Sequence, residues 1–258
     1  MDPRRRTCLR AMEIDLWVSK GGPEWRARQE DFKQETPDSA DTRSFDAAPV
    51  TVQAESPSPG VETAAFGALD AVSELGWDAL RENAVNCHNC DLHETRTQVV
   101  FGVGNRNASL MVVGEAPGAD EDRQGEPFVG RAGQLLNAML EAIGFARDQV
   151  YIANIIKCRP PGNRDPHIEE TAACQPFLHR QIALLQPQLI LSVGRVSAHN
   201  LLGTEDSVGR LRGRVDRFDP GDIPLIVTDH PAYLLRRPLE KSKAWQDLQA
   251  VHRQLSQA

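Results

Sequence analysis

Four short apolar runs, each separated from the next by a helix-like segment, constrain the fold of this chain most strongly. Continuous apolar strands that alternate with helices are typical of a parallel sheet covered on both faces. We therefore expect an α/β protein with three layers, α/β/α, around a mainly four-stranded parallel sheet. The expected strands are residues 110–113, 150–156, 189–193 and 224–228. The expected helices are residues 132–143, 168–185, 196–202 and 241–255.

The part of the chain before this pattern divides into two segments of different composition. Residues 1–26 contain an apolar run that predicts a short helical segment. Residues 27–64 are rich in Asp, Glu, Ser, Pro, Thr and Ala, a composition that predicts a disordered acidic linker. A helical pattern resumes at residues 66–85, so we expect one folded domain over residues 65–258.

The charge of the chain is distributed unevenly. The 258 residues carry a formal net charge of −7, but residues 30–75 hold ten acidic and two basic residues, so the remainder of the chain has a net charge of +1. In salt solution the attraction between a basic side chain and a phosphate is screened beyond about 10 Å. Local clusters of basic residues therefore matter more for phosphate binding than the net charge of the whole chain. The acidic total therefore does not exclude a nucleic-acid partner.

Four of the five cysteines form two spaced pairs, which favours metal ligation over a disulfide framework. Cys87 and Cys90 enclose two residues, and Cys158 and Cys174 enclose fifteen. Four thiolates suit either structural zinc or an iron–sulfur cluster, and the spacing leaves both open. Cys8 is expected to be a free thiol. Because no apolar stretch approaches the roughly 20 residues of a membrane span, we expect a cytoplasmic protein with no membrane partner.

Polar residues follow the expected strands at the point where each strand ends. Gly114 and Glu115 end the first strand, Asn154 lies in the second, Arg195 follows the third and His230 follows the fourth. In an open parallel sheet, ligands bind outside the carboxyl ends of the strands. These residues are therefore expected to share one ligand-binding edge.

The residue types at this edge suit recognition of a planar base. Phe128 lies in a loop between glycines, where an aromatic face can stack on an extruded ring. The amide of Asn154 can donate and accept at once, which matches the O4 acceptor and N3–H donor of uracil. His230 can hydrogen-bond an oxygen that gains negative charge, and Glu115 can hold water or face developing positive charge. Arginines beside such a pocket, Arg195, Arg236 and Arg237, are expected to contact DNA phosphates.

The motif set resembles the family 4 uracil-DNA glycosylases of bacteria and archaea. The resemblance covers residues 77–250, and the segment before it is similar to an N-terminal extension of some bacterial members. The motifs lie around the four paired cysteines and are GEAPG (114–118), GEPFVGRAGQLL (125–136), NIIKCRPPGNRDP (154–166) and HPAYLLRR (230–237).

The resemblance implies a role for each matching residue. Glu115 and His230 are the implied catalytic residues, and His230 faces uracil O2. The implied substrate-binding residues are Gly114, Ala116, Glu121, Phe128, Asn154 and His230, with Glu121 crowding the C5 methyl group of thymine. The four paired cysteines carry one [4Fe–4S] cluster in this family, so the resemblance selects iron–sulfur over zinc.

The expected function is base excision repair by a monofunctional uracil-DNA glycosylase. Such an enzyme flips deoxyuridine out of single- or double-stranded DNA and hydrolyses its N-glycosidic bond, which leaves free uracil and an abasic site. A related branch that traps the abasic sugar covalently carries glutamine where Ala116 stands, so turnover is expected here. Two alternatives stay open: a metal-stapled DNA-binding protein without catalysis, and a glycosylase for another deaminated base. A monomer is expected, and protein partners are not indicated.

Overall fold

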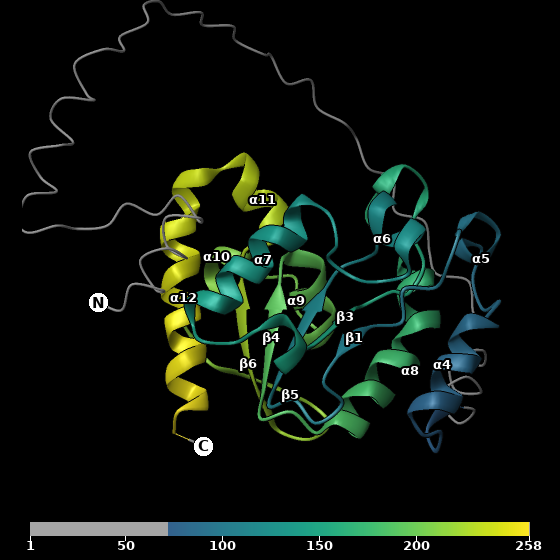
Figure 1. Cartoon of the computed structure of the whole chain (residues 1–258), viewed down its shortest axis with the longest axis horizontal. Coiled ribbons are helices and arrows are strands. Elements are labelled where there is room, and N and C mark those ends of the chain that lie inside the picture. Colours follow the sequence, from purple (N-terminus) through teal and green to yellow (C-terminus); the bar gives the residue numbers. More distant parts are fainter. Residues whose placement is uncertain (1–71, 258) are drawn as a thin grey trace, which may run out of the picture.

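The computed structural model describes residues 72–257. The expectations for residues 1–26, residues 27–64 and Cys8 lie outside this part of the chain. Within it, an α/β domain is built around one six-stranded sheet (Figure 1). The strands are β1 (Val103–Gly104), β2 (Leu110–Gly114), β3 (Tyr151–Asn154), β4 (Leu189–Val193), β5 (Asp216–Phe218) and β6 (Ile223–Thr228).

Two of the described helices, α4 and α5, precede the first strand, and the others lie between the strands or after them. The α-helices are α4 (Trp77–Val85), α5 (Leu92–Thr95), α6 (Ala119–Gln124), α7 (Arg131–Ala142), α8 (Ile168–Leu185), α9 (Arg195–Leu202), α10 (Val208–Leu211), α11 (Pro231–Arg236) and α12 (Lys241–Leu255). Three short 3-10 helices are η1 (Arg147–Gln149), η2 (Pro161–Asn163) and η3 (Pro238–Glu240). None of the helices in the described part of the chain has the length and apolar character needed to span a bilayer.

The strand order is β1-β3-β2-β4-β6-β5. The four central strands β3, β2, β4 and β6 run parallel, which confirms the predicted parallel sheet. The two edge strands β1 and β5 pair antiparallel with their neighbours and were not predicted. Both are only two or three residues long and partly exposed, so they lack the continuous apolar run by which a buried strand is recognised.

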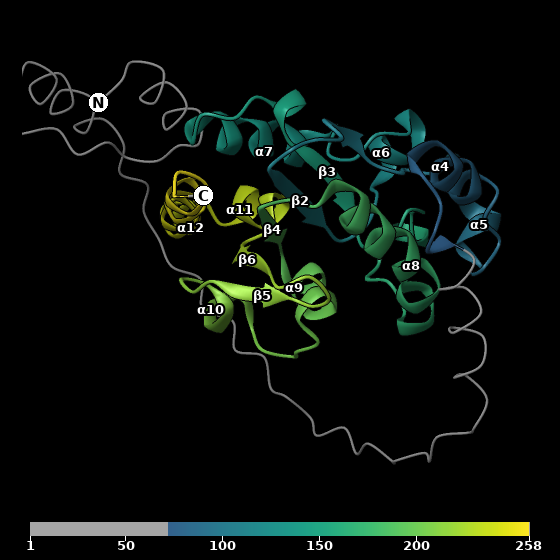
Figure 2. The same cartoon turned by 90° about the horizontal axis from the view of Figure 1, so that it is seen from below.

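Two helical layers cover the sheet, as predicted for an α/β/α fold (Figure 2). Apolar residues of α4, α8 and α9 pack on one face of the sheet, together with Met111 and Ile190. Residues of α7 and α12 pack on the other face, against Val112 and Leu191. Because β-strand side chains alternate between faces, each central strand supplies both cores.

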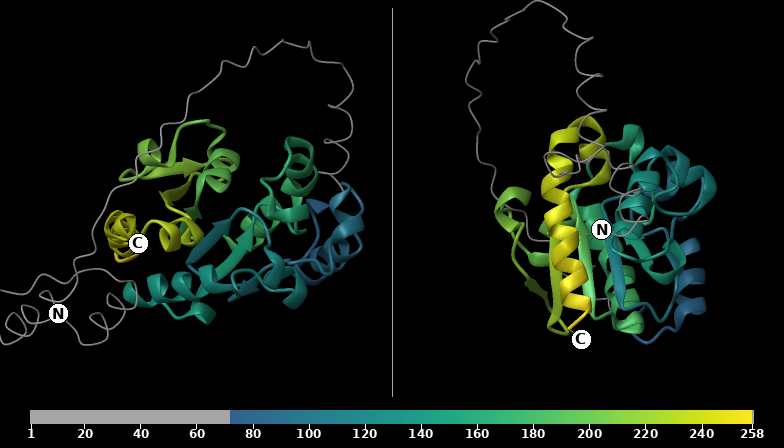
Figure 3. Two further views of the ribbon diagram at one scale, coloured as in Figure 1. Left: turned by 90° about the horizontal axis from the view of Figure 1, so that it is seen from above. Right: turned by 60° about the vertical axis from the view of Figure 1, so that its left-hand side comes forward.

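The final helix α12 packs against strands β4 and β6 (Figure 3). It buries Ala244, Leu248 and Val251, which recur three and four residues apart and so form one face of the helix. Its contacts fix the sheet near the point where β6 ends and α11 begins. The loops at the carboxyl ends of the central strands are thereby held between two rigid layers.

Candidate active site

The carboxyl ends of the four parallel strands bring the predicted polar residues to one edge of the sheet. Gly114 at the end of β2 lies opposite Asn154 at the end of β3. On the other side, the backbone N–H of Gly194 donates to the carbonyl oxygen of Thr228 at 2.9 Å, which places His230 beside the end of β4. Gly114, Asn154 and His230 therefore share one edge, although they lie far apart in the sequence.

Phe128 closes this edge from the loop between α6 and α7. Its side chain is buried, and its ring centroid lies 5.6 Å from that of His230, with an angle of 30° between the planes. A Cβ atom on Gly114 would lie 2.5 Å from Asn154 Oδ1 and 2.6 Å from Phe128 Cζ. The absence of a side chain at Gly114 therefore allows the amide and the aromatic ring to approach each other.

The backbone of Phe128 is held in an unusual conformation by two charged side chains. Its φ of +54° lies in the left-handed region, which costs a non-glycine residue about 1 to 3 kcal/mol. Glu121 accepts hydrogen bonds from the N–H groups of Val129 and Gly130 at 2.9 and 3.1 Å. Arg147 donates to the carbonyl oxygen of Phe128 at 3.2 Å. These contacts offset the strain and fix the direction of the ring.

The sequence did not predict that Glu121 and Arg147 support the loop of Phe128. Glu121 also accepts from the N–H of Gly118 at 3.1 Å, so its carboxylate joins the residue before α6 to the loop that carries Phe128. Arg147 lies 19 residues after Phe128 and donates to Pro127 as well, at 2.6 Å. No local pattern marks such a contact, because it depends on where the chain returns after α7.

His230 is held as a neutral hydrogen-bond donor. Its Nδ1 accepts from the backbone N–H of Ala232 at 3.1 Å, so the ring proton of the neutral form resides on Nε2. Burial is the main cause that lowers the pKa of His230 to about 4, and the nearby positive charge of Arg236 acts in the same direction. At neutral pH the ring is therefore uncharged, and its Nε2–H takes no part in the capping contact with Ala232.

Glu115 has the opposite electrostatic setting. Burial and the neighbouring carboxylate of Asp165 raise the pKa of Glu115 to about 6, and the positive charge of Arg195 partly offsets them. Arg195 and Asp165 form an exposed ion pair at the rim. Above pH 6 the carboxyl group of Glu115 is therefore mostly ionised, while His230 stays neutral.

The remaining predicted residues lie around this pocket. Ala116 is partly buried and packs against the core beneath the edge. Arg236 and Arg237 are exposed at the end of α11, and Arg236 is close enough to His230 to lower its pKa. Together with Arg195, these arginines put positive charge on the rim, where DNA phosphates could be contacted.

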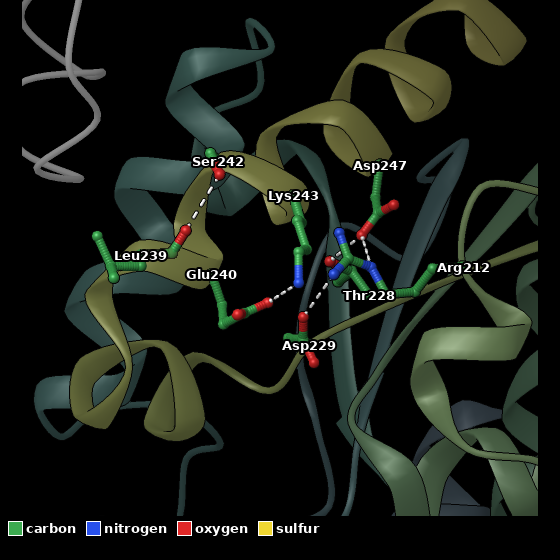
Figure 4. Close-up of polar contacts among 8 residues, drawn as sticks. All are labelled: Arg212, Thr228, Asp229, Leu239, Glu240, Ser242, Lys243 and Asp247. Atoms are coloured by element: carbon green, nitrogen blue, oxygen red, sulfur yellow. Dashed lines mark hydrogen bonds and ion pairs between the residues drawn. The ribbon is translucent and has the colours of Figure 1, made fainter.

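A partly buried ion network supports the strand end that leads into His230 (Figure 4). Arg212 donates to the carboxylates of Asp229 and Asp247, each at 2.8 Å. The hydroxyl of Thr228 donates to Asp247 at 2.7 Å. The network joins α12 to the two residues that precede His230. No local sequence pattern indicates it, because Arg212 lies 17 residues from Asp229 and 35 residues from Asp247.

The four predicted metal ligands line one cavity, which we call the cysteine cradle and define by Cys87, Cys90, Cys158 and Cys174. All four are free thiols in the structure. The first two follow α4, the third follows β3 and the fourth lies on α8. Burial raises the pKa of Cys174 to about 12 and also raises the pKa of Cys158 and Cys90. A bound cationic group is therefore needed to favour the thiolates.

Hydrogen-bond donors point at the sulfur atoms of the cradle. Arg96 donates to Cys158 Sγ at 3.2 Å, and the backbone N–H of Lys157 donates to Cys174 Sγ at 3.2 Å. Such donors stabilise sulfur ligands of metal centres. Among residues 72–257, no three His, Cys, Asp or Glu side chains are arranged to hold a single metal ion. The four cysteines instead surround a cavity, an arrangement that suits a group held by several thiolates on different sides.

Comparison with known proteins agrees with this architecture. The type-4 uracil-DNA glycosylase of Archaeoglobus fulgidus is 42% identical over 180 residues, which cover 67% of this chain and 90% of that protein. The type-4 enzyme of Thermotoga maritima is 44% identical over 161 residues, which cover 62% of this chain and 83% of the Thermotoga protein. A type-5 uracil-DNA glycosylase of Pyrobaculum aerophilum is 32% identical over 109 residues, 36% of this chain and 48% of its own.

A sequence profile extends the same relationship over the sheet and its loops. The profile of the uracil DNA glycosylase superfamily matches residues 101–249, which contain all six strands and the pocket residues at their carboxyl ends. Because this match spans more than half of the chain and the two type-4 relatives are aligned over most of their own length, the chain belongs to the uracil DNA glycosylase superfamily.

Proposed function

We propose that this protein excises uracil from DNA as a monofunctional glycosylase in base excision repair. The observation that carries the proposal is the convergence of Phe128, Asn154 and His230 at one edge of the sheet, with Glu115 beside them. The similarity to type-4 uracil-DNA glycosylases supports the same activity. Bond cleavage separates uracil from C1′ of the deoxyribose, and a water molecule adds to that carbon.

In this proposal the flipped base is bound by neutral groups. Phe128 stacks on the ring, and the amide of Asn154 pairs with O4 and N3–H of uracil, an arrangement that cytosine cannot match. The Nε2–H of His230 donates to O2, where negative charge develops as the base leaves. A neutral donor suits this role because an already charged imidazolium would also attract the phosphates of undamaged DNA.

The sugar side of the reaction is assigned to Glu115. Its ionised carboxylate stabilises the positive charge that builds on the deoxyribose and accepts hydrogen bonds from the attacking water. The proton released when water adds to C1′ passes to this carboxylate or to solvent, and the uracil anion takes a proton from solvent after it leaves. No amine nucleophile takes part, so the DNA strand remains intact at the abasic site.

Specificity and DNA binding involve residues around the pocket. We assign to Glu121 the exclusion of the C5 methyl group of thymine, a role compatible with its hydrogen bonds to the loop of Phe128. Arg195, Arg236 and Arg237 would contact phosphates on either side of the flipped nucleotide. We extend the sequence-based expectation to a cytoplasmic monomer whose partner is DNA and whose catalytic domain spans residues 65–258.

The cysteine cradle is proposed to hold one [4Fe–4S] cluster. Its four thiols come from three separate parts of the chain, so a bound cluster would tie α4, the end of β3 and α8 together. The group supplies structural cross-linking and takes no part in bond cleavage. This assignment is tested by measuring iron and sulfide in protein purified without oxygen. A bound cluster should also give an absorbance shoulder at about 400 nm. Stoichiometric zinc in place of iron would contradict it.

The activity is tested with an oligonucleotide that contains one deoxyuridine and a matched one that contains thymidine. The proposed reaction produces free uracil and a site that breaks only after alkali treatment. Binding of the uracil oligonucleotide without any alkali-labile site would instead identify a DNA-binding protein without catalysis. A panel that includes hypoxanthine and xanthine separates uracil excision from removal of another deaminated base.

A further inference from the structure

One fully buried ammonium group lies between the pocket and the cysteine cradle. Lys157 is 2% exposed. Its Nζ donates to the backbone carbonyl oxygen of Asn154 at 2.8 Å and to Oε1 of Gln181 at 2.7 Å. A buried charge is costly unless it is hydrogen-bonded and compensated, so this lysine requires an explanation that a surface lysine does not.

The backbone of Lys157 ties the same residue to the cradle. Its N–H donates to Cys174 Sγ at 3.2 Å, and Cys158 follows it directly in the chain. Its carbonyl oxygen accepts from the N–H of Val100 at 2.8 Å. Three residues after Asn154, the chain therefore passes from the base-reading edge to the metal-ligating cavity, and Lys157 contacts both.

The position of the ammonium group is fixed by a further buried side chain. Gln181 is 0% exposed, and its Nε2 donates to the carbonyl oxygen of Phe101 at 2.9 Å and to the hydroxyl of Tyr151 at 3.2 Å. These bonds orient Oε1 of Gln181 toward Lys157. The two acceptors of the Lys157 ammonium group, one backbone carbonyl and one amide oxygen, are neutral, so they leave its positive charge uncompensated. The backbone of Lys157 contacts Cys174 Sγ and continues directly to Cys158, so thiolates formed at these two positions by a bound cluster would compensate the charge.

We propose that Lys157 is a positioning residue that acts on both sites: it holds the end of β3 so that Asn154 can read the base, and it supplies a buried positive charge that retains the anionic cluster in the cradle. The proposal rests on the proposed function, because it assumes uracil as the base and a cluster on the four thiols. It explains why a lysine, rather than an apolar residue of similar length, occupies a fully buried position next to two ligands.

The cluster side is tested with Lys157→Met, which keeps the length of the side chain and removes its charge. Iron retention is followed during incubation with a chelator, through iron per chain and absorbance near about 400 nm. We expect the variant to lose iron about tenfold faster than the wild type, with Lys157→Arg recovering most of the difference. Lys243→Met, which removes an ammonium group paired with Glu240 at 2.6 Å on the surface of α12, is the matched control for iron loss.

The base-reading side is tested by a double-mutant cycle with Asn154→Ala. Inhibition of DNA binding by free uracil gives the affinity of the pocket for the base. We expect Lys157→Met to weaken that affinity about tenfold in the wild-type background and to have no further effect when Asn154 is already Ala. The wild-type assays test the proposed function, and the differences between variants test this inference, so the two can fail separately. Wild-type iron retention in Lys157→Met, or equal weakening in both backgrounds, would overturn the inference.

Discussion

The pocket at the sheet edge and the cysteine cradle are built on opposite electrostatic principles, although Asn154 and Cys158 are only four residues apart. The pocket keeps its histidine neutral by burial, whereas burial together with Asp165 raises the pKa of its Glu115 carboxyl group to about 6. The cradle gathers four thiols, and burial raises the pKa of Cys90, Cys158 and Cys174, with Lys157 and Arg96 beside them. The pocket is thus preorganised by the protein alone, whereas the buried thiols of the cradle would ionise only with the proposed metal group bound.

This comparison predicts that damage to the pocket removes activity and leaves the fold intact. Asn154→Ala should lower the rate of uracil release about a thousandfold, because an amide that pairs with both O4 and N3–H of the base is lost from the pocket. Single-turnover release of uracil from an oligonucleotide measures the rate. Iron content and thermal midpoint serve as controls and should match the wild type. Near wild-type turnover would remove Asn154 as the base reader.

Substitutions in the cysteine cradle should instead lower stability and iron content while leaving most of the activity of the folded protein. Cys174→Ser should abolish iron binding and lower the thermal midpoint by roughly 10 °C, because the link between α8 and the end of β3 is lost. The fraction that remains folded should still release uracil at a rate reduced less than about tenfold. Calorimetry and single-turnover kinetics on the same sample measure both quantities. A folded variant with full stability and no activity would reverse the assignment of the two regions.

The pH dependence of the reaction sharpens the contrast within the pocket. Glu115 must be ionised to face a cationic sugar, and burial raises its pKa to about 6, so activity should rise with pH through that value. Between pH 7.5 and pH 5 the single-turnover rate should fall about tenfold. His230, with its pKa lowered to about 4, stays neutral over this range and does not contribute. Glu115→Gln should be slower and independent of pH, and a flat wild-type profile would contradict the role of Glu115.

The smallest expected effect concerns the rim. Arg237→Ala should weaken DNA binding about threefold at moderate salt and reduce the salt dependence by about one counterion, as expected for loss of one phosphate contact. Titration of a labelled oligonucleotide at several salt concentrations measures the slope. The affinity for free uracil should stay the same, because this side chain is exposed at the end of α11. A change in uracil affinity with an unchanged salt slope would place Arg237 in the pocket.

The sequence predicted the elements whose pattern is local and strong. The bounds of β4, α8 and α12 match the expected ranges, because each is a continuous apolar run or a long helical repeat. The antiparallel edge strands β1 and β5 were not predicted, because they are defined by pairing with a neighbouring strand and have no distinctive pattern of their own. Motif position likewise sufficed to place Gly114, Asn154 and His230 at one edge.

The residues that hold this edge in place could not be predicted in the same way. Arg147 supports Phe128 from 19 positions away, and Arg212 reaches Asp229 from 17 positions away. Lys157 stood inside a motif, yet its burial became evident only with α8 and Gln181 in place. A local pattern reveals side chains that perform chemistry, whereas the partners that position them depend on the completed fold.

The central claim is that one flipped uracil contacts Phe128, Asn154 and His230 at the same time. A crystal structure of the slow variant Glu115→Gln, bound to DNA that contains one deoxyuridine, tests it most directly. We predict uracil stacked on Phe128, with O4 and N3–H paired to the amide of Asn154 and O2 accepting from His230 Nε2. A base that remains in the helix, or that occupies a pocket lacking any of these three contacts, would contradict the account.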